Sequence, residues 1–320
     1  MLSISHLTKK YGDTVAVDDL SLTINSGEIY GFIGHNGAGK STTIKSVAGI
    51  LAFENGEITI DGLSIKDQPI ECKKIMAYIP DNPDLYDFMS GIKYLNFIAD
   101  IFGVSAADRQ ERIRKYADAF ELTEDLAQPI NAYSHGMKQK LAIISAWIHQ
   151  PKLIIMDEPF VGLDPKASHL LKQMMREMCD NGGAIFFSTH VLDVAEKLCD
   201  KVAIIKNGKL IKSGTMEEVK GDSSLENVFL ELEYMVIVIN GGVPVFDKTQ
   251  NKYVDQAAKK EEEEKAKQEE LNENLTEQKR DFSEFKPSVD EVDKTNDKSP
   301  TAADNSMGGI IISEEDDLPF

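Results

Sequence analysis

The sequence has few cysteines and no long hydrophobic run. Its cysteines, Cys72, Cys179 and Cys199, are too few and too widely spaced for a disulfide framework or a metal site, which is typical of a reducing compartment. No apolar stretch approaches the ~20 residues that a membrane-spanning helix needs, and the best candidate, 234–246, is interrupted by two glycines and a proline. The first ten residues also lack the basic start and apolar block of a secretion signal. We therefore expect a cytoplasmic chain whose attachment to a membrane depends on a partner.

Positive charge is also in short supply. The 320 residues carry 54 Asp and Glu against 35 Lys and Arg, which gives a formal net charge of −19. Residues 221–320 hold 25 of the acids and only 11 of the basic residues, so most of the excess lies there. Such an acidic balance disfavours binding to nucleic acid or to an anionic membrane surface. We expect no nucleic-acid partner.

Several short segments predict an α/β fold. The stretch 29–33 reads as a strand that runs into a glycine-rich turn and then a helical segment, 41–51. The runs 153–156 and 184–187 are apolar throughout, as expected for parallel strands that are covered on both faces. From 92 to 126, apolar residues recur at helical spacing. Since 42% of the residues are apolar, the chain can bury a sizeable core, and we expect a doubly wound parallel sheet with an α-helical insert.

Composition also predicts where the chain divides. The patterned part covers 1–220, with its helical insert at about 84–150. A C-terminal extension, 221–250, follows, and residues 235–246 within it read as a hairpin around an Asn-Gly turn. Residues 251–320 are rich in Glu, Lys, Gln and Asn and contain few large apolar side chains. We expect this last segment to be an acidic low-complexity tail that is largely disordered.

The strand at 29–33 leads into a phosphate-binding loop that matches G-x-x-x-x-G-K-[ST] between a predicted strand and a predicted helix. Glycines let the backbone wrap closely round phosphates, and the helix N-terminus adds positive potential. A chance glycine-rich turn would match the bare pattern roughly once in a hundred sequences of this length. We expect Lys40 to reach the β and γ phosphates, Ser41 to bind Mg²⁺ and Thr42 to contact the α-phosphate side. The predicted nucleotide-binding residues of the loop are Gly34, His35, Asn36, Gly37, Ala38, Gly39, Lys40, Ser41 and Thr42.

Two carboxylates follow the apolar run at 153–156. Ligands bind at the carboxyl ends of strands in open α/β sheets, so Asp157 and Glu158 are predicted to lie at a site. Asp157 fits the carboxylate that holds Mg²⁺, and Glu158 fits the group that orients and deprotonates the attacking water. The alternative is a strand that simply ends in solvent. The upstream phosphate loop makes that alternative a minor one.

Residues 133–140 (Tyr-Ser-His-Gly-Met-Lys-Gln-Lys) resemble the signature motif of the ATP-binding cassette (ABC) family, and they precede the Asp-Glu strand as they do in that family. Tyr11 is similar to the family's adenine-stacking aromatic residue, 161–164 to the loop after the catalytic carboxylate, and 188–190 to the segment with the switch histidine. Alone, such a Tyr or His is more often a packing or surface residue, and their order along the chain favours the functional interpretation. Over roughly 1–220, the resemblance implies a phosphate-loop NTPase (RecA-like) core with an antiparallel β subdomain and an α-helical signature subdomain.

The resemblance also implies partners and roles. It implies a head-to-tail dimer with a second cassette subunit, in which ATP and Mg²⁺ lie between one phosphate loop and the other chain's signature helix. Ser134 and Gly136 would then meet the γ phosphate at a helix N-terminus. His190 would contact the γ phosphate and the water, and Asp164 would link it to the opposite subunit.

The sequence departs from the family pattern in two places. The family usually has Gln after a strand where this chain has Asp81, whose carboxylate is a candidate Mg²⁺ contact that adds negative charge beside the triphosphate. The signature motif has His135 and Met137 where Gly and Gln are usual. We still expect an active ATPase.

The segment around Leu85, Tyr86 and Phe88 corresponds to the family surface that grips a short helix of the membrane subunit, although an ordinary core patch is the alternative. Residues 224–232 resemble the end of cassette subunits from bacterial exporters with a separate permease. The resemblance therefore implies an ATP-hydrolysing subunit that energises transport, with export favoured, through a separate transmembrane permease. It would lie in the cytoplasm, peripheral on the inner face of the cell membrane.

Two other classes of function compete with this interpretation. A non-transport cassette protein would act on ribosomes or DNA, and such proteins usually carry two cassettes or a long coiled-coil insertion, neither of which is evident here. Sedimentation with ribosomes would favour it. A nucleotide-binding regulator without turnover would keep its ATPase activity unchanged on Glu158→Gln.

Overall fold

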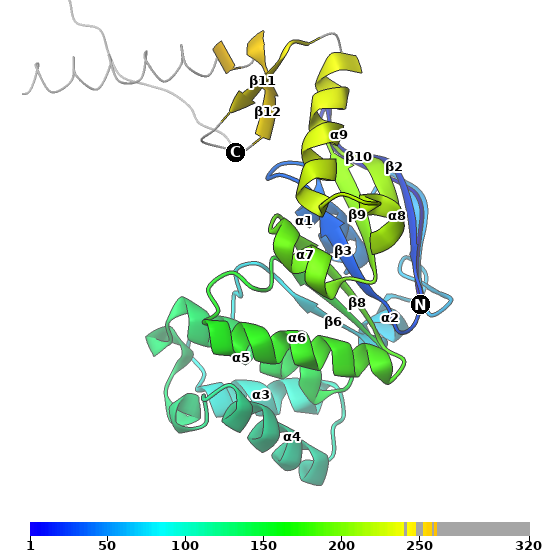
Figure 1. Ribbon diagram of the computed structural model, residues 1–320. Coiled ribbons are helices and arrows are strands. Elements are labelled where there is room, and N and C mark those ends of the chain that lie inside the picture. Colours follow the sequence, from blue (N-terminus) through cyan, green and yellow to red (C-terminus); the bar gives the residue numbers. More distant parts are fainter. Residues whose placement is uncertain (240–241, 248–251, 258, 261–320) are drawn as a thin grey trace, which may run out of the picture. The chain divides into compact units, whose positions relative to one another are not determined.

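The computed structural model describes residues 1–239, 242–247, 252–257 and 259–260. Within them, six strands form a central sheet (Figure 1). Its neighbours are parallel from β9 to β6, and β10 is an antiparallel edge strand. Parallel neighbours need crossover connections, and the helices supply them. In order across the sheet, the strands are β10 (Lys209–Thr215), β9 (Lys201–Lys206), β3 (Ile29–Ile33), β8 (Ala184–Thr189), β7 (Leu153–Asp157) and β6 (Met76–Ile79).

The central sheet is covered on both faces, as the apolar runs predicted. In β3, Ile29 and Ile33 belong to one hydrophobic cluster, whereas Tyr30 and Phe32 belong to another. Successive side chains of a strand point to opposite faces, so the two clusters lie on opposite sides of the sheet. Every residue of β3, β7 and β8 is buried. The predicted α/β fold with a doubly covered parallel sheet is confirmed.

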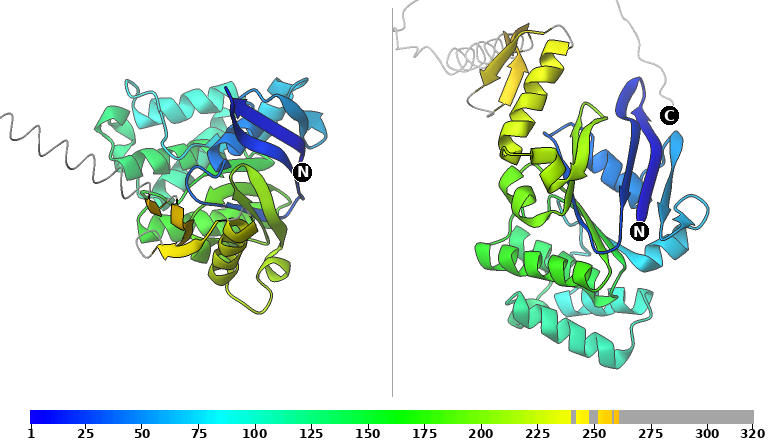
Figure 2. Two further views of the ribbon diagram at one scale, coloured as in Figure 1. Left: turned by 90° about the horizontal axis from the view of Figure 1, so that it is seen from above. Right: turned by 45° about the vertical axis from the view of Figure 1, so that its right-hand side comes forward.

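One face of the central sheet packs against an antiparallel sheet, drawn in blue in the right-hand view of Figure 2. Its first strand is longer than its apolar part, 2–7, because pairing with the next strand continues to Tyr11, which lies opposite Thr14. Two helices complete this side. The elements are β2 (Thr14–Ile24), β1 (Leu2–Tyr11), β4 (Asn55–Ile60), β5 (Leu63–Ser64), α1 (Lys40–Val47) and α2 (Pro69–Ile75).

Helices cover the other face. The predicted helical insert consists of α3 (Gly91–Ile101), α4 (Ala106–Ala119), two short 3₁₀ turns (Glu124–Ala127 and Ile130–Ala132) and α5 (His135–Ile148). These helices group together at the lower end of Figure 1, next to α6 (Pro165–Asp180). α7 (Leu192–Leu198) and α8 (Met216–Lys220) follow β8 and β10. The apolar faces of these helices form one continuous cluster with β3 and β7, so the helical insert packs directly on this face of the sheet.

The C-terminal extension differs from the predicted hairpin at 235–246. A helix, α9 (Leu225–Ile239), covers the first half of that segment, and β11 (Pro244–Asp247) pairs instead with β12 (Lys252–Asp255). The β-branched run near the helix end favours a strand locally. A helix forms instead, because Leu225 and Phe229 at its start are buried in the main hydrophobic cluster and the helix continues through that run.

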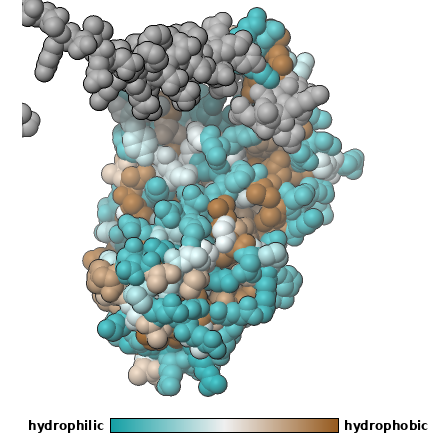
Figure 3. Space-filling model, turned by 90° about the vertical axis from the view of Figure 1, so that its left-hand side faces the viewer, coloured by the Kyte–Doolittle hydropathy of each residue, from teal (hydrophilic) through white to brown (hydrophobic). Residues whose placement is uncertain are grey.

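Residues Met1–Lys259 form one compact unit. The predicted acidic tail enters this unit only at its beginning, and residues 261–320 lie outside the described residues. Within the described part of the chain, no helix combines the length and apolarity needed to cross a bilayer. Cys72, Cys179 and Cys199 are buried as free thiols. On the face shown in Figure 3, hydrophobic residues form separate patches within a hydrophilic surface.

Candidate nucleotide-binding site

The glycines of the predicted phosphate loop are required by close contacts or by backbone conformation. Gly39 precedes α1 with φ 107°, and a Cβ there would lie 2.6 Å from the carbonyl oxygen of Ala16. Gly37 has φ 81°, also in the left-handed region. A Cβ on Gly34 would lie 2.6 Å from the carbonyl oxygen of Ile205. The loop therefore depends on glycine both for its backbone conformation and for its close contact with two neighbouring strands.

Lys40 is the first residue of α1 and is 5% exposed. Its Nζ donates to the carbonyl oxygens of Gly34 at 2.6 Å and His35 at 3.2 Å, and it lies 3.4 Å from Oε1 of Glu158. A buried ammonium that is surrounded by oxygens is a ready binding group for an anionic ligand. The loop and Glu158 thus enclose one positive charge.

A cavity of about 330 Å³ lies over this ammonium. The predicted loop residues that line it are joined by Ala16 of β2, Asp81 and Glu158. Ala16 was not predicted, since nothing in the sequence marks a small residue on a distant strand. The lining residues are Ala16, His35, Asn36, Gly37, Gly39, Lys40, Ser41, Thr42, Asp81 and Glu158.

A serine on the neighbouring strand organises the two predicted carboxylates. Asp157 ends β7, is 2% exposed and lies opposite Ser188 of β8 in the parallel register. The Ser188 hydroxyl donates to Oδ1 of Asp157 and accepts the backbone N–H of Glu158 at 3.1 Å. Sequence reasoning assigned Ser188 no role of its own. The available signal was its place at the end of an apolar strand beside that of Asp157.

Glu158 adopts an unusual backbone conformation. Its φ is 46°, in the left-handed region that non-glycine residues rarely enter. Such a conformation costs about 1–3 kcal/mol and is found where the surrounding structure imposes it, often at functional sites. The turn aims a mostly buried side chain at His190, whose Nδ1 lies 3.0 Å from Oε2 of Glu158. Glu158 is therefore held between Lys40 and His190.

Asp81 lies just beyond the end of β6 and faces the same cavity as Ser41 and Glu158. The pKa of the neighbouring Tyr78 reflects its burial and also the negative charge of Asp81. Burial, and then the negative charges of Asp157 and Asp81, raise the pKa of Tyr78 well above its ordinary value. Asp81 and Asp157 therefore act on one neighbouring phenol, as expected for carboxylates that share one edge of the sheet.

The donors at this edge suit Mg²⁺, a hard cation that prefers carboxylate, hydroxyl and phosphate oxygens. Among the described residues, no group of three or more His, Cys, Asp and Glu side chains is arranged to hold a metal. A Mg²⁺ ion here would therefore need further oxygens, which the phosphates of a nucleotide supply. The glycine cradle, the buried ammonium and the hydroxyl of Ser41 fit a nucleotide together with Mg²⁺.

Residues predicted from the signature motif and the adenine-stacking position lie away from this cavity. Ser134 is exposed and caps α5, accepting the N–H of Met137 at 3.3 Å. A Cβ on Gly136 would lie 2.7 Å from the carbonyl oxygen of Gly162, so the signature turn packs against the loop after Glu158. Tyr11 is 50% exposed at the end of β1. None of the three lines the cavity over Lys40.

Asp164 caps the other helix at this surface. Its Oδ1 accepts the N–H of Ala167 at 2.8 Å, and its Oδ2 pairs with Nζ of Lys140 at 2.7 Å. The hydrogen bond from Lys140 holds the pKa of Asp164 below its usual value. Lys140 lies on α5, so this pair ties the signature helix to the loop that follows Glu158. Like Ser134, Asp164 is not among the residues that line the cavity.

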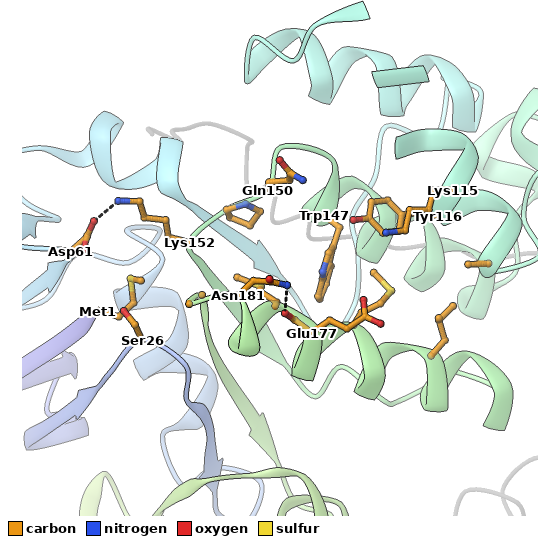
Figure 4. A pocket seen from close by; sticks show the side chains of 17 residues that line it. Met1, Ser26, Asp61, Lys115, Tyr116, Trp147, Gln150, Lys152, Glu177 and Asn181 are labelled. Atoms are coloured by element: carbon orange, nitrogen blue, oxygen red, sulfur yellow. Dashed lines mark hydrogen bonds and ion pairs between the residues drawn. The ribbon is translucent and has the colours of Figure 1, made fainter. Parts of the chain in front are cut away.

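A larger cavity, of about 850 Å³, lies at the opposite edge of the sheet (Figure 4). Pro151 and Lys152 precede β7, and Gly183 precedes β8, so this cavity faces the amino ends of the strands. Figure 4 shows Trp147 and Tyr116 on its helical side. Ligands of open α/β sheets bind at the carboxyl ends of the strands instead. Of these two cavities, the smaller one contains the glycine loop and the buried Lys40, and it is therefore the candidate site.

The fold and the smaller cavity together define a phosphate-loop nucleotide-binding protein. Residues 17–161 match the family model described as ABC transporter. The chain is 34% identical over 237 residues to the ABC-type transporter ATP-binding protein EcsA of Bacillus subtilis (strain 168). The matched region covers 72% of this chain and 96% of that relative. The chain belongs to the ATP-binding cassette transporter family.

Two further comparisons agree. The linearmycin resistance ATP-binding protein LnrL of Bacillus subtilis (strain 168) is 31% identical over 219 residues, covering 68% of this chain and 70% of that relative. A solved structure described as the ATP-binding subunit of an ABC transporter superposes with a TM-score of 0.70 at 35% identity, covering 72% of this chain and 99% of that one. These likenesses confirm the resemblance found in the sequence.

Proposed function

We propose that this chain binds and hydrolyses ATP as the energising subunit of a transporter. The observation that carries the proposal is one constellation: Lys40 buried under a glycine cradle, with Glu158 held 3.4 Å from its Nζ and His190 3.0 Å beyond. A cation for phosphate, a carboxylate for water and a histidine at the same edge of the sheet suit phosphoryl transfer to water. The proposed ATPase domain is 1–220.

Each residue has a distinct role in this proposal. Lys40 and the loop N–H groups bind the β and γ phosphates. Ser41, Asp157 and Asp81 are the candidate holders of Mg²⁺, which when bound neutralises phosphate charge. Glu158 orients the attacking water and accepts its proton, and His190, whose Nδ1 lies 3.0 Å from Oε2 of Glu158, contacts the γ phosphate and the water. Tyr11 is half exposed, and its ring is proposed to stack on the adenine.

We further propose a head-to-tail dimer. Ser134 and Gly136 lie at the exposed N-terminus of α5 and outside the cavity of their own chain. A second copy or a related cassette would bring such a helix N-terminus to the phosphates of this chain, where its N–H groups favour negative charge. Asp164, on the same surface, would then link His190 to the opposite subunit. The site would be complete only when two chains meet.

The proposed partner of this dimer is a separate transmembrane permease, and the proposed direction is export. Three features support them: the family membership, the absence of a spanning helix in the described residues and the exporter-like segment at 224–232. The printed name of LnrL, a resistance protein, agrees with export. The test is purification of the full chain from gently solubilised membranes. A multi-span protein should co-purify with it, whereas recovery with ribosomes would reverse the assignment.

Asp81 gives the first prediction about the proposed metal site. Asp81→Ala removes an oxygen ligand and also a negative charge beside the triphosphate, so we expect the Mg²⁺ concentration for half-maximal ATPase activity to change by several-fold. Asp81→Gln restores the side chain usual in the family and should retain an oxygen contact. Mg²⁺ titrations of ATP hydrolysis at fixed ATP provide the measurement. An unchanged titration for Asp81→Ala would show that Asp81 does not contact the metal.

The exposed aromatic residues give a second prediction. Phe88 is 80% exposed and Tyr86 48% exposed, and the Tyr86 ring contacts Phe88, Tyr94 and Phe97. Such a patch suits an apolar helix of a permease. We expect Phe88→Ser to release the chain from washed membranes while ATP binding is unchanged. Val15→Ser, on an exposed apolar residue of β2, is the control, and equal retention of both variants would contradict the proposed docking role.

A further inference from the structure

His35 connects the proposed nucleotide site to the C-terminal helix. It lines the cavity over Lys40 and also a second cavity of about 330 Å³. That second cavity is bounded by the segment that follows the switch histidine and by α9. Its lining residues are Gly34, His35, His190, Val191, Leu192, Asp193, Glu226, Phe229 and Leu230. One loop residue therefore lies between the phosphate cradle and an element more than 180 positions away along the chain.

The contact between His35 and α9 is an aromatic one. The rings of His35 and Phe229 are 4.9 Å apart at their centroids and meet edge to face, at 66°. Phe229 is 7% exposed and belongs to the main hydrophobic cluster, so its position is set by the core. Edge-to-face pairs at this separation contribute attraction beyond the area that they bury. The His35 ring is thus in contact with a buried partner outside the loop.

The start of α9 is fixed in turn to the helix after the switch histidine. Glu196 of α7 accepts the backbone N–H of Leu225 at 3.0 Å and Nζ of Lys220 at 2.7 Å. The hydrogen bond from Lys220 keeps the pKa of Glu196 below its ordinary value, so the carboxylate is charged near neutral pH. Leu225 is fully buried. These contacts set where α9 begins and therefore where Phe229 meets the loop.

The backbone of His35 is part of the phosphate cradle. Its carbonyl oxygen accepts Nζ of Lys40 at 3.2 Å and the N–H of Ala38 at 3.1 Å. A shift of His35 would therefore move an acceptor of the phosphate-binding lysine and reshape the loop. We infer that Phe229 is a positioning residue for nucleotide binding: by packing on His35 it holds the phosphate loop in its binding conformation, although it contacts no nucleotide.

This inference rests on the proposed ATPase function, and it makes α9 part of the nucleotide site. A structural residue of the core would affect only the stability of the fold, whereas a positioning residue of the loop affects the affinity for ATP. Phe229→Leu keeps an apolar side chain and removes the ring, so it separates the two roles. We expect KM for ATP to rise roughly three- to tenfold, the range that an aromatic pair supplies, with kcat unchanged.

Val228→Ala is the matched control, because Val228 is the neighbouring residue on α9, is buried in the same cluster and makes no ring contact with His35. It should lower Tm at least as much as Phe229→Leu and leave KM unchanged. In a His35→Leu background, adding Phe229→Leu should raise KM no further. Should Phe229→Leu fail to fold, Phe229→Met takes its place, since the flexible thioether fills irregular space.

The full-length chain and MgATP serve for all of these assays. The inference is overturned if Phe229→Leu leaves KM unchanged, if Val228→Ala raises KM equally, or if the two substitutions at His35 and Phe229 act additively. Failure of the proposed function has a different appearance: the unaltered chain would then neither bind nor hydrolyse ATP.

Discussion

Glu158→Gln is expected to lower the rate of ATP hydrolysis by about 10²–10⁴-fold, the contribution of a positioned general base. Glutamine keeps the shape of the side chain and its contact with the N–H of His190, which lies 3.4 Å from Oε2, but it cannot accept the proton of water. ATP binding should survive, because Lys40 and the glycine cradle are untouched. Single-turnover hydrolysis measures the loss, and size-exclusion chromatography with ATP should show dimers accumulating.

Glu177→Gln is the matched control for this substitution. Glu177 lies on α6 and lines the cavity at the amino ends of the strands, so the same change of chemistry is made away from Lys40. Its hydrolysis rate should equal that of the unaltered chain. If Glu158→Gln also retained the rate of the unaltered chain, Glu158 would not be the general base, and a chain without any turnover would instead be a nucleotide-binding regulator.

Lys40→Ala is expected to weaken ATP binding by about a hundredfold. Hydrogen bonds to charged groups contribute roughly 1.5–3 kcal/mol each, and a buried ammonium that reaches the β and γ phosphates makes at least one of them. The substitution also leaves Glu158 without its neighbouring cation, which lies 3.4 Å away. Both effects disfavour an anionic ligand in the cavity. Titration of the purified chain with a fluorescent ATP analogue measures the affinity.

Lys45→Ala tests whether the effect is specific to the site. Lys45 lies five residues, or about 1.4 turns, further along α1 and is not among the residues that line the cavity. Its loss changes the net charge of the chain equally, so the affinity for ATP should stay close to that of the unaltered chain. Equal affinity in Lys40→Ala and the unaltered chain would disprove the phosphate-loop assignment.

Much of the fold was predictable because its signals are local. The apolar runs at 153–156 and 184–187 are typical of covered strands and are observed as β7 and β8, and β3 has the predicted bounds, Ile29–Ile33. The predicted helical insert is likewise observed as α3, α4 and α5. The hairpin predicted at 235–246 was wrong, since burial of Leu225 and Phe229 in a distant core outweighs local β propensity. The length of β1 also depends on its pairing partner.

The chemistry of the candidate site is carried by residue types and order, and the sequence alone therefore identified the glycine loop, Lys40, Asp157 and Glu158. Only the tertiary structure shows which of the predicted residues share a cavity. Asp81 and Glu158 both line the cavity over Lys40, whereas Ser134, Gly136 and Asp164 do not, and their predicted roles remain predictions that a dimer would test.

The tertiary structure alone revealed the contacts between residues far apart in sequence. Ser188 joins Asp157 to the N–H of Glu158 only because β7 and β8 are neighbours in register, and Phe229 reaches His35 only because α9 packs back on the core. Motifs record chemistry along the chain, where a few adjacent residues suffice. The positions of side chains depend on packing between distant segments. The hydrophobic effect is not directional, so the sequence around an apolar residue does not show which distant segment it packs against.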